Sequence, residues 1–201
     1  MAICFDVDGV IADFSRGFSA VVQELTSGRA PLVEDYSEVK TWQWAPWYWP
    51  EGFSNELNEE AWAYIGRSWN FWANLVPLFP HDMSYLAPRA RSVPIVFMTR
   101  REGPLAWEQT VAFLDRWNVR EPLVQRVKSG EEKDTLCARL GINTIVDNNP
   151  KTLERCRDAG MNTIAMSWPY NEQVEGVRRA TSLRQAIELA QMLDARNKKG
   201  A

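Results

Sequence analysis

The sequence has little of the chemistry on which many metal centres and disulfide frameworks depend. Its 201 residues contain one histidine, His81, and three cysteines, Cys4, Cys137 and Cys156. A single histidine excludes a multi-histidine metal centre, and three cysteines without metal-ligand spacing indicate neither a zinc site nor a disulfide framework. A reduced, cytoplasmic setting is therefore expected.

Long apolar segments and an excess of one charge are also absent. No apolar run approaches the roughly 18 residues that a membrane-spanning helix needs, and Met1 and Ala2 lead straight into an apolar segment without the basic start of a signal peptide. The 23 basic and 26 acidic residues give a formal net charge of −3. Since proteins that bind duplex nucleic acid usually present a basic face, we expect neither a membrane nor duplex nucleic acid as a partner.

Tryptophan, in contrast, is abundant, and most of it is concentrated in one part of the chain. Of the ten tryptophans, seven lie in one stretch: Trp42, Trp44, Trp47, Trp49, Trp62, Trp69 and Trp72. Residues from about 29 to 54 show no helical or strand period. They are expected to form loops that carry aromatic side chains.

Short apolar runs alternate with helical patterns along most of the chain. The apolar runs predict strands at 3–7, 94–98, 123–127, 144–146 and 162–166, the last being the final strand. Periodicity, caps and turn residues predict helices at 14–28, 54–67, 82–88, 104–117, 131–140, 150–160 and 182–193. Such alternation is typical of a parallel sheet with helices on both faces. We therefore expect an α/β fold, a Rossmann-like three-layer α/β/α core with a parallel sheet. The core would comprise residues 1–14 plus 90–201, and residues 15–89 would form an inserted, mostly helical, Trp-rich cap.

Polar residues follow three of the predicted strands. Asp6-Val7-Asp8-Gly9 ends the first strand, Thr99 follows the second, and Asp147-Asn148 follows the fourth. Because ligands bind beyond the carboxyl ends of the strands in an open parallel sheet, these side chains are expected to meet. Crowded carboxylates repel unless a hard cation neutralises them, and an oxygen-lined site suits Mg²⁺. With the ion and an adjacent lysine, a phosphate dianion becomes an acceptable ligand.

These residues also carry a resemblance to a known superfamily. Asp6-Val-Asp-Gly-Val-Ile11 resembles the first signature of the haloacid dehalogenase superfamily of phosphatases, and Thr99 resembles the second. Lys133 resembles the third, and Asp147-Asn148 the fourth, where a second acid is commoner than asparagine. All four occur in order, and they span the core on both sides of the predicted cap.

The resemblance implies a role for each of these positions. Asp6 would be the nucleophile that forms an aspartyl-phosphate, and Asp8 the acid and base that serves the leaving group and water. Thr99 and Lys133 would hold the phosphoryl oxygens, with Arg100 as a further phosphate contact. Mg²⁺ would be held by the carboxylates of Asp6 and Asp147 and by Asp8 through its backbone carbonyl.

Each of these roles has a structural alternative. Asp8-Gly9 is also an ordinary turn sequence, and Thr99 also fits a simple strand end. Lys133 competes with Lys128 for the lysine role, and Arg101 suits either a phosphate contact or a solvated loop. Asn148 fits a ligand of metal-bound water as well as it fits a helix cap.

The predicted cap narrows the substrate class. Residues 6–14 and the run Asn70-Phe-Trp-Ala-Asn-Leu-Val-Pro-Leu78 are similar to the 5′(3′)-deoxyribonucleotidases and their bacterial and phage relatives. A nucleobase stacks on flat aromatic faces, so Trp44, Phe71 and Trp72 are predicted to bind substrate. The alternative is that these rings form the core of the cap or a homodimer contact.

The combined prediction is a Mg²⁺-dependent phosphomonoester hydrolase with a small phosphorylated substrate, a (deoxy)nucleoside monophosphate cleaved at its 5′ phosphate. The alternatives are a phosphatase for another small phosphomonoester or a nucleic-acid end, and a catalytically idle relative that serves as a binding module.

Overall fold

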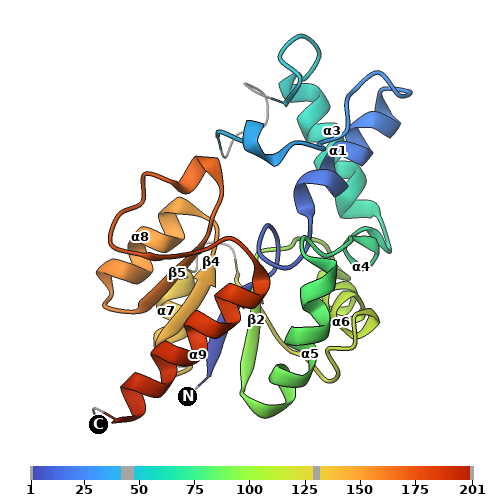
Figure 1. Ribbon diagram of the computed structural model, residues 1–201. Helices are drawn as coiled ribbons and strands as arrows, with labels where there is room; N and C mark the ends of the chain where they lie inside the picture. Colours follow the sequence, from blue (N-terminus) through green and yellow to red (C-terminus); the bar gives the residue numbers. More distant parts are fainter. Residues whose placement is uncertain (1, 42–47, 129–131, 200–201) are drawn as a thin grey trace.

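The computed structural model describes residues 2–41, 48–128 and 132–199. Within these ranges, six strands form one parallel sheet in the order β3-β2-β1-β4-β5-β6 (Figure 1). The strands are β1 (Ile3–Asp6), β2 (Ile95–Thr99), β3 (Leu123–Arg126), β4 (Thr144–Asp147), β5 (Asn162–Met166) and β6 (Arg178–Ala180). The chain adds β2 and β3 on one side of β1 and then returns to add β4 on the other side.

Helices cover both faces of this sheet. One face packs against α5 (Met83–Ser92), α6 (Ala106–Arg116) and α9 (Leu183–Lys199), and the other against α7 (Lys133–Arg139) and α8 (Pro150–Asp158). Successive side chains of a strand point to opposite faces, so Ile3 and Phe5 join the larger apolar cluster and Cys4 joins the smaller one. The predicted three-layer α/β/α class is confirmed.

Further helices lie beyond the carboxyl ends of the strands, the first two at the top of Figure 1 and the third below them. They are α1 (Phe14–Leu25), α3 (Asn55–Arg67) and α4 (Phe71–Asn74). Their starts follow from local chemistry, since a side-chain oxygen that accepts from a free backbone N–H stabilises the first turn of a helix. The Arg16 N–H donates to Asp13 Oδ1 at 3.0 Å, and the Leu57 N–H donates to Ser54 Oγ at 3.2 Å.

The division into core and cap stays a prediction. In the described part of the chain, three short 3₁₀ helices connect the larger elements: η1 (Tyr36–Glu38), η2 (Pro80–Asp82) and η3 (Pro169–Asn171). Most of α5 falls in the range expected for the cap, yet this helix lies beside α9 and the sheet (Figure 1). None of the helices in the described ranges combines the length and apolar character needed to cross a bilayer.

Two expectations about the elements were wrong. Asn162–Met166 is not the last strand, because β6 pairs in parallel with it. The sequence Arg178-Arg179-Ala180 has no apolar run, so this short edge strand gives no hydrophobic signal. The helix expected to end near Pro88 continues to Ser92. The burial of Leu86 and Ala87 against the core explains how α5 tolerates the proline.

Candidate active site

A cavity of about 680 Å³ opens at the carboxyl ends of the strands. Its floor carries Asp6 from β1, Asp8 and Gly9 from the following loop, Lys133 from α7, and Asn148 after β4. The connections of the sheet change direction at β1, and this is where ligands bind in open α/β sheets.

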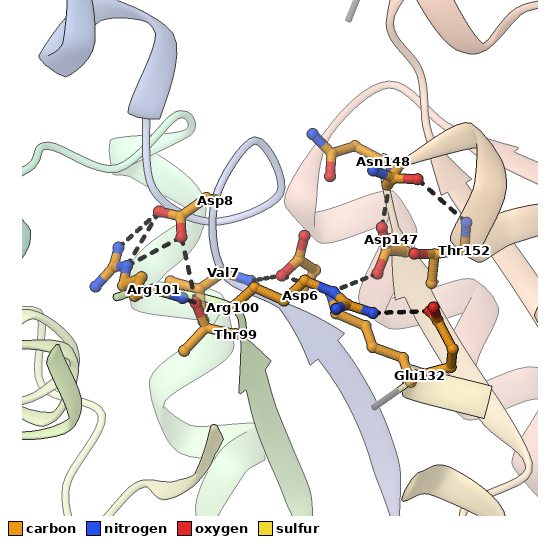
Figure 2. A network of polar contacts seen from close by, with 12 residues as sticks. Asp6, Val7, Asp8, Thr99, Arg100, Arg101, Glu132, Asp147, Asn148 and Thr152 are labelled. Atoms are coloured by element: carbon orange, nitrogen blue, oxygen red, sulfur yellow. Dashed lines mark hydrogen bonds and ion pairs between the residues drawn. The ribbon is translucent and has the colours of Figure 1, made fainter. Parts of the chain in front are cut away.

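One buried lysine joins the ends of β1 and β4. Lys133 Nζ lies 2.8 Å from Asp6 Oδ1 and 2.7 Å from Asp147 Oδ2. Backbone N–H groups hold the same carboxylates: Val7 donates to Asp6 Oδ1 and Asn149 to Asp147 Oδ1, each at 2.8 Å. Asp6 and Asp147 therefore share one ammonium group in a fixed geometry (Figure 2).

Burial and the neighbouring charges shift the pKa values of Asp6 and Lys133. Burial raises the pKa of Asp6 from 3.8 to about 7; Lys133 opposes this rise, and Asp147 and Asp8 add to it. Burial alone would lower the pKa of Lys133, but the carboxylates of Asp147 and Asp6 outweigh it, so the pKa lies above its ordinary value. The lysine therefore stays charged, and it lies beside two carboxyl groups that together can carry more negative charge than one ammonium group neutralises.

Asp8 belongs to a second ion pair. Arg101 binds its carboxylate through two nitrogens, with Nη2–Oδ1 at 2.8 Å and Nε–Oδ2 at 3.0 Å. The Thr99 hydroxyl donates to Asp8 Oδ2 at 3.3 Å and accepts from the Arg101 N–H at 3.1 Å. Figure 2 shows Asp8 facing Arg101, on the opposite side of Asp6 from Asp147. Such a bidentate pair fixes the orientation of a carboxylate.

These contacts and the burial of the side chains bear on two alternatives that the sequence left open. Arg101 is 3% exposed, so the solvated-loop alternative is wrong. Its partner is Asp8, an interaction that the sequence did not suggest. Lys133 is buried in the site, whereas Lys128 is exposed. Arg100 lines the cavity and pairs with Glu132 at 2.8 Å.

Asn148 is fixed by a residue that the sequence did not single out. Its Nδ2 donates to the Tyr170 hydroxyl at 2.8 Å, and both residues line the cavity. Asn148 Oδ1 is buried and accepts no hydrogen bond from the described part of the chain. A buried carbonyl oxygen without a donor is costly, so a ligand in the cavity is a natural partner.

Stacked aromatic rings line the cavity on the side of α1 and α3. Phe14 lies between Trp62, at 5.6 Å and 24°, and Trp72, at 5.8 Å and 20°. Trp72 was predicted from the sequence to bind substrate. Phe14 was expected to begin a helix and to end the segment that resembles the deoxyribonucleotidases, and Trp62 was noted as part of the tryptophan-rich stretch. Phe71 is not among the lining residues and packs edge-on against Phe14 and Trp72. Trp44 lies outside the described residues.

The oxygen donor atoms of the site suit a hard cation, although the carboxylates of the described residues are not arranged around a common metal position. Among the described residues, no group of three or more histidine, cysteine or acidic side chains is arranged to hold a metal ion. Lys133 lies between Asp6 and Asp147, and Arg101 compensates Asp8. However, the carboxylate oxygens of Asp6 and Asp147, and Asn148 Oδ1, which accepts no hydrogen bond from the described residues, are oxygen donors of the kind that fits Mg²⁺ rather than a softer metal.

Gly9→Ala should destabilise the protein more than Gly28→Ala. Both glycines have a positive φ, 77° and 83°, so each alanine adds the strain of a left-handed residue, about 1–2 kcal/mol. Only at position 9 would the new methyl group also collide, lying 2.0 Å from Asn148 Nδ2, whereas nothing lies within 4 Å at position 28. Overpacking typically adds about 1–3 kcal/mol. Urea unfolding of the two variants measures the difference, and equal losses would contradict it.

Solved structures with the same architecture come from several bacteria. A haloacid dehalogenase-like hydrolase from Streptococcus pneumoniae superposes with a TM-score of 0.58 at 14% identity, covering 96% of this chain and 97% of that chain. A haloacid dehalogenase family hydrolase from Deinococcus radiodurans, solved with bound phosphate and sodium, gives 0.58 at 16% identity, with coverages of 96% and 95%. A predicted phosphoglycolate phosphatase from Haemophilus somnus gives 0.59 at 13%, with coverages of 94% and 96%. At these identities the likeness establishes the fold.

The family follows from the sequence match. A comparison with curated proteins gave no match. The family described as "5' nucleotidase, deoxy (Pyrimidine), cytosolic type C protein" has a model that matches residues 1–198. Since the match extends over nearly the whole chain, the protein belongs to this nucleotidase family of phosphatases, on a haloacid dehalogenase fold.

Proposed function

We propose that the protein is a Mg²⁺-dependent 5′-nucleotidase that hydrolyses (deoxy)nucleoside monophosphates through an aspartyl-phosphate. The observation that carries the proposal is one cavity with Asp6 and Lys133 on its floor and the rings of Phe14, Trp62 and Trp72 on its wall. A phosphate fits the charged floor, and a base fits the stacked rings. Membership of the nucleotidase family supports the same substrate class.

In the proposed reaction Asp6 attacks phosphorus while the bond from phosphorus to the ester oxygen breaks. Asp8, oriented by Arg101 and Thr99, would enter this step in its protonated form and give that proton to the departing 5′ oxygen. Asp8 then takes a proton from a water molecule, which attacks the phosphorus of the aspartyl-phosphate and releases inorganic phosphate. Asp6 returns to its starting form, so the cycle is closed.

Positive groups stabilise the charge that spreads over the phosphoryl oxygens. Lys133 is already charged beside Asp6, and Arg100 lines the same cavity. The carboxylates of Asp6 and Asp147 and the backbone carbonyl of Asp8 would hold Mg²⁺. When bound, the ion would offset the excess negative charge and attract the phosphoryl oxygens.

The proposal is tested by phosphate release from a panel of monophosphates, with added Mg²⁺ and after treatment with EDTA. We expect nucleoside 5′-monophosphates to be the best substrates and EDTA to abolish turnover. Activity confined to sugar phosphates would contradict the nucleotide part. Full activity in EDTA would contradict the metal dependence.

Trp62→Ala should raise the KM for a nucleoside monophosphate by roughly tenfold. Stacking on an aromatic ring contributes about 1–3 kcal/mol per base, and Trp62 is 41% exposed, so its loss leaves the fold intact. The KM for deoxyribose 5-phosphate, which has no base, should change much less. Trp69→Ala is the matched control, because Trp69 is 75% exposed and does not line this cavity. Equal effects on both substrates would argue against base stacking at Trp62.

We also propose a cytoplasmic location. The word "cytosolic" in the family description supports it, as do the three free, buried cysteines. The homodimer stays a prediction that sedimentation velocity would check.

A further inference from the structure

The segment Trp168–Asn171, here called the aromatic strap, connects two loops that are far apart in the sequence. Trp168 Nε1 donates to the backbone carbonyl of Gly9 at 2.8 Å. The indole stacks on the ring of Tyr170, with centroids 5.5 Å apart and an angle of 18°. The loop after β1, which carries Asp8 and Gly9, is thereby tied to the segment after β5.

Tyr170 extends this link to the loop after β4. Its hydroxyl accepts from Asn148 Nδ2 at 2.8 Å. Because the amide nitrogen is engaged by Tyr170, the amide oxygen is left as the free end of the side chain, and it has no donor within the described residues. The Asn148 side chain also packs closely against Gly9 in the loop after β1, since a methyl group at Gly9 would lie 2.0 Å from Asn148 Nδ2. The loop after β1, the loop after β4 and the aromatic strap therefore all contact one another.

A buried amide and an arginine keep the strap in shape. Asn171 is fully buried, and its Nδ2 donates to the carbonyls of Asn148, at 2.9 Å, and Met166, at 2.8 Å. Its Oδ1 accepts from the Trp168 N–H at 3.2 Å and from Arg179 Nη1 at 3.1 Å. Arg179 Nη2, from β6, donates to three further carbonyls, those of Asn171 in the strap and of Glu172 and Val174 just after it. Such a fully bonded network is rigid.

From this geometry we propose that Trp168 and Tyr170 are positioning residues for the reaction. Tyr170 sets the orientation of the Asn148 amide, so that Oδ1 faces the ion or its bound water. Trp168 holds the loop that carries Asp8. Neither ring transfers a proton or forms a bond in the reaction. The inference rests on the proposed function and extends it to residues outside the four signatures.

The first test compares Tyr170→Phe with Tyr85→Phe. Each change removes one phenolic hydroxyl that has a side-chain partner, but Tyr85 bonds to Glu188 between α5 and α9, away from the cavity. We expect Tyr170→Phe to weaken Mg²⁺ binding, followed by the rise in melting temperature with added Mg²⁺, by about 10–100-fold. The turnover number should fall while KM changes little. Tyr85→Phe should behave as the wild type.

The second test compares Trp168→Phe with Trp107→Phe. Both changes remove an indole N–H that donates to a backbone carbonyl, because Trp107 Nε1 in α6 donates to the Val124 carbonyl in β3 at 3.2 Å. The Trp168 variant should lose turnover by about tenfold or more, the range found for groups that orient ligands. The Trp107 variant should keep its turnover.

A double-mutant cycle separates positioning from simple stabilisation. If Tyr170 acts through Asn148, adding Tyr170→Phe to Asn148→Ala should cause no further loss of Mg²⁺ affinity or turnover. A purely structural tyrosine would lower the melting temperature in both backgrounds and leave Mg²⁺ affinity unchanged, which would overturn the inference. An inactive wild-type protein would instead contradict the proposed function, and the Mg²⁺-dependent melting shift would still test the strap.

Discussion

Asp6→Asn is expected to lower phosphate release from a nucleoside monophosphate by at least about 10⁴-fold, the order of loss seen when a nucleophile is removed. The amide has nearly the same shape as the carboxylate but cannot attack phosphorus. It keeps an oxygen for the Val7 N–H, which donates to Asp6 at 2.8 Å in the wild type. Steady-state phosphate release measures the effect. Asp115→Asn, at a surface ion pair with Arg120, is the control. Turnover within tenfold of the wild type would exclude Asp6 as the nucleophile.

The same variant should not lose stability. In the folded protein the pKa of Asp6 is about 7, above its ordinary 3.8. A carboxyl group whose pKa is raised on folding costs stability in its ionised form. That cost develops between pH 3.8 and about 7 and is complete above it. At pH 8 without metal, the asparagine variant should therefore melt at or above the wild-type temperature, which scanning fluorimetry would show. If Asp6→Asn is inactive but melts at the wild-type temperature, the loss of phosphate release comes from the missing nucleophile and not from unfolding.

The residues at the strand ends of the site were the part most accessible from sequence. Parallel strands end at one edge of the sheet, so Asp6, Thr99 and Asp147 had to lie near one another once their strands were recognised. Lys133 followed from its position at the start of the helix that leads to β4. The fold class was predicted from the alternation of strands and helices, and the family was predicted from the resemblance of the motifs; both are confirmed.

The supporting contacts were not accessible in this way. Trp168 and Gly9 are separated by 159 positions, and nothing in the local sequence around Trp168 or Tyr170 indicates their partners. Arg101 was noticed only as a neighbour of Thr99, because its ion pair with Asp8 depends on how two loops approach each other. Such contacts depend on the packing of the tertiary structure, which periodicity and turn chemistry do not encode.

The charges of the site are compensated in two separate groups, one of two side chains and one of three. Arg101 forms an ion pair with Asp8, whereas Lys133 forms ion pairs with both Asp6 and Asp147. Removing Arg101 would leave the Asp8 carboxylate without its counter-charge. Removing Lys133 would leave two buried carboxylates, those of Asp6 and Asp147, close together without a counter-charge. Lys133 is therefore the residue whose loss should affect stability and activity together.

Lys133→Met should reduce the free energy of unfolding by about 3–5 kcal/mol, because breaking a buried ion pair from one side leaves an uncompensated charge. It should also lower turnover by about 10²–10³-fold through loss of a positive group at the phosphate. Urea unfolding in EDTA and phosphate release in Mg²⁺ measure the two effects. Lys151→Met, at an exposed position of α8, is the matched control.

A second variant separates the two roles of the lysine. In Lys133→Met/Asp147→Asn one of the two carboxylates becomes neutral, so much of the lost stability should return, while turnover should stay low because the phosphate still lacks its lysine. Mg²⁺ should stabilise Lys133→Met more than the wild type, since the ion would replace the missing positive charge. If the double variant were as unstable as Lys133→Met, then packing of the lysine stem rather than charge would explain the loss. If turnover returned with stability, Lys133 would have no part in the chemistry.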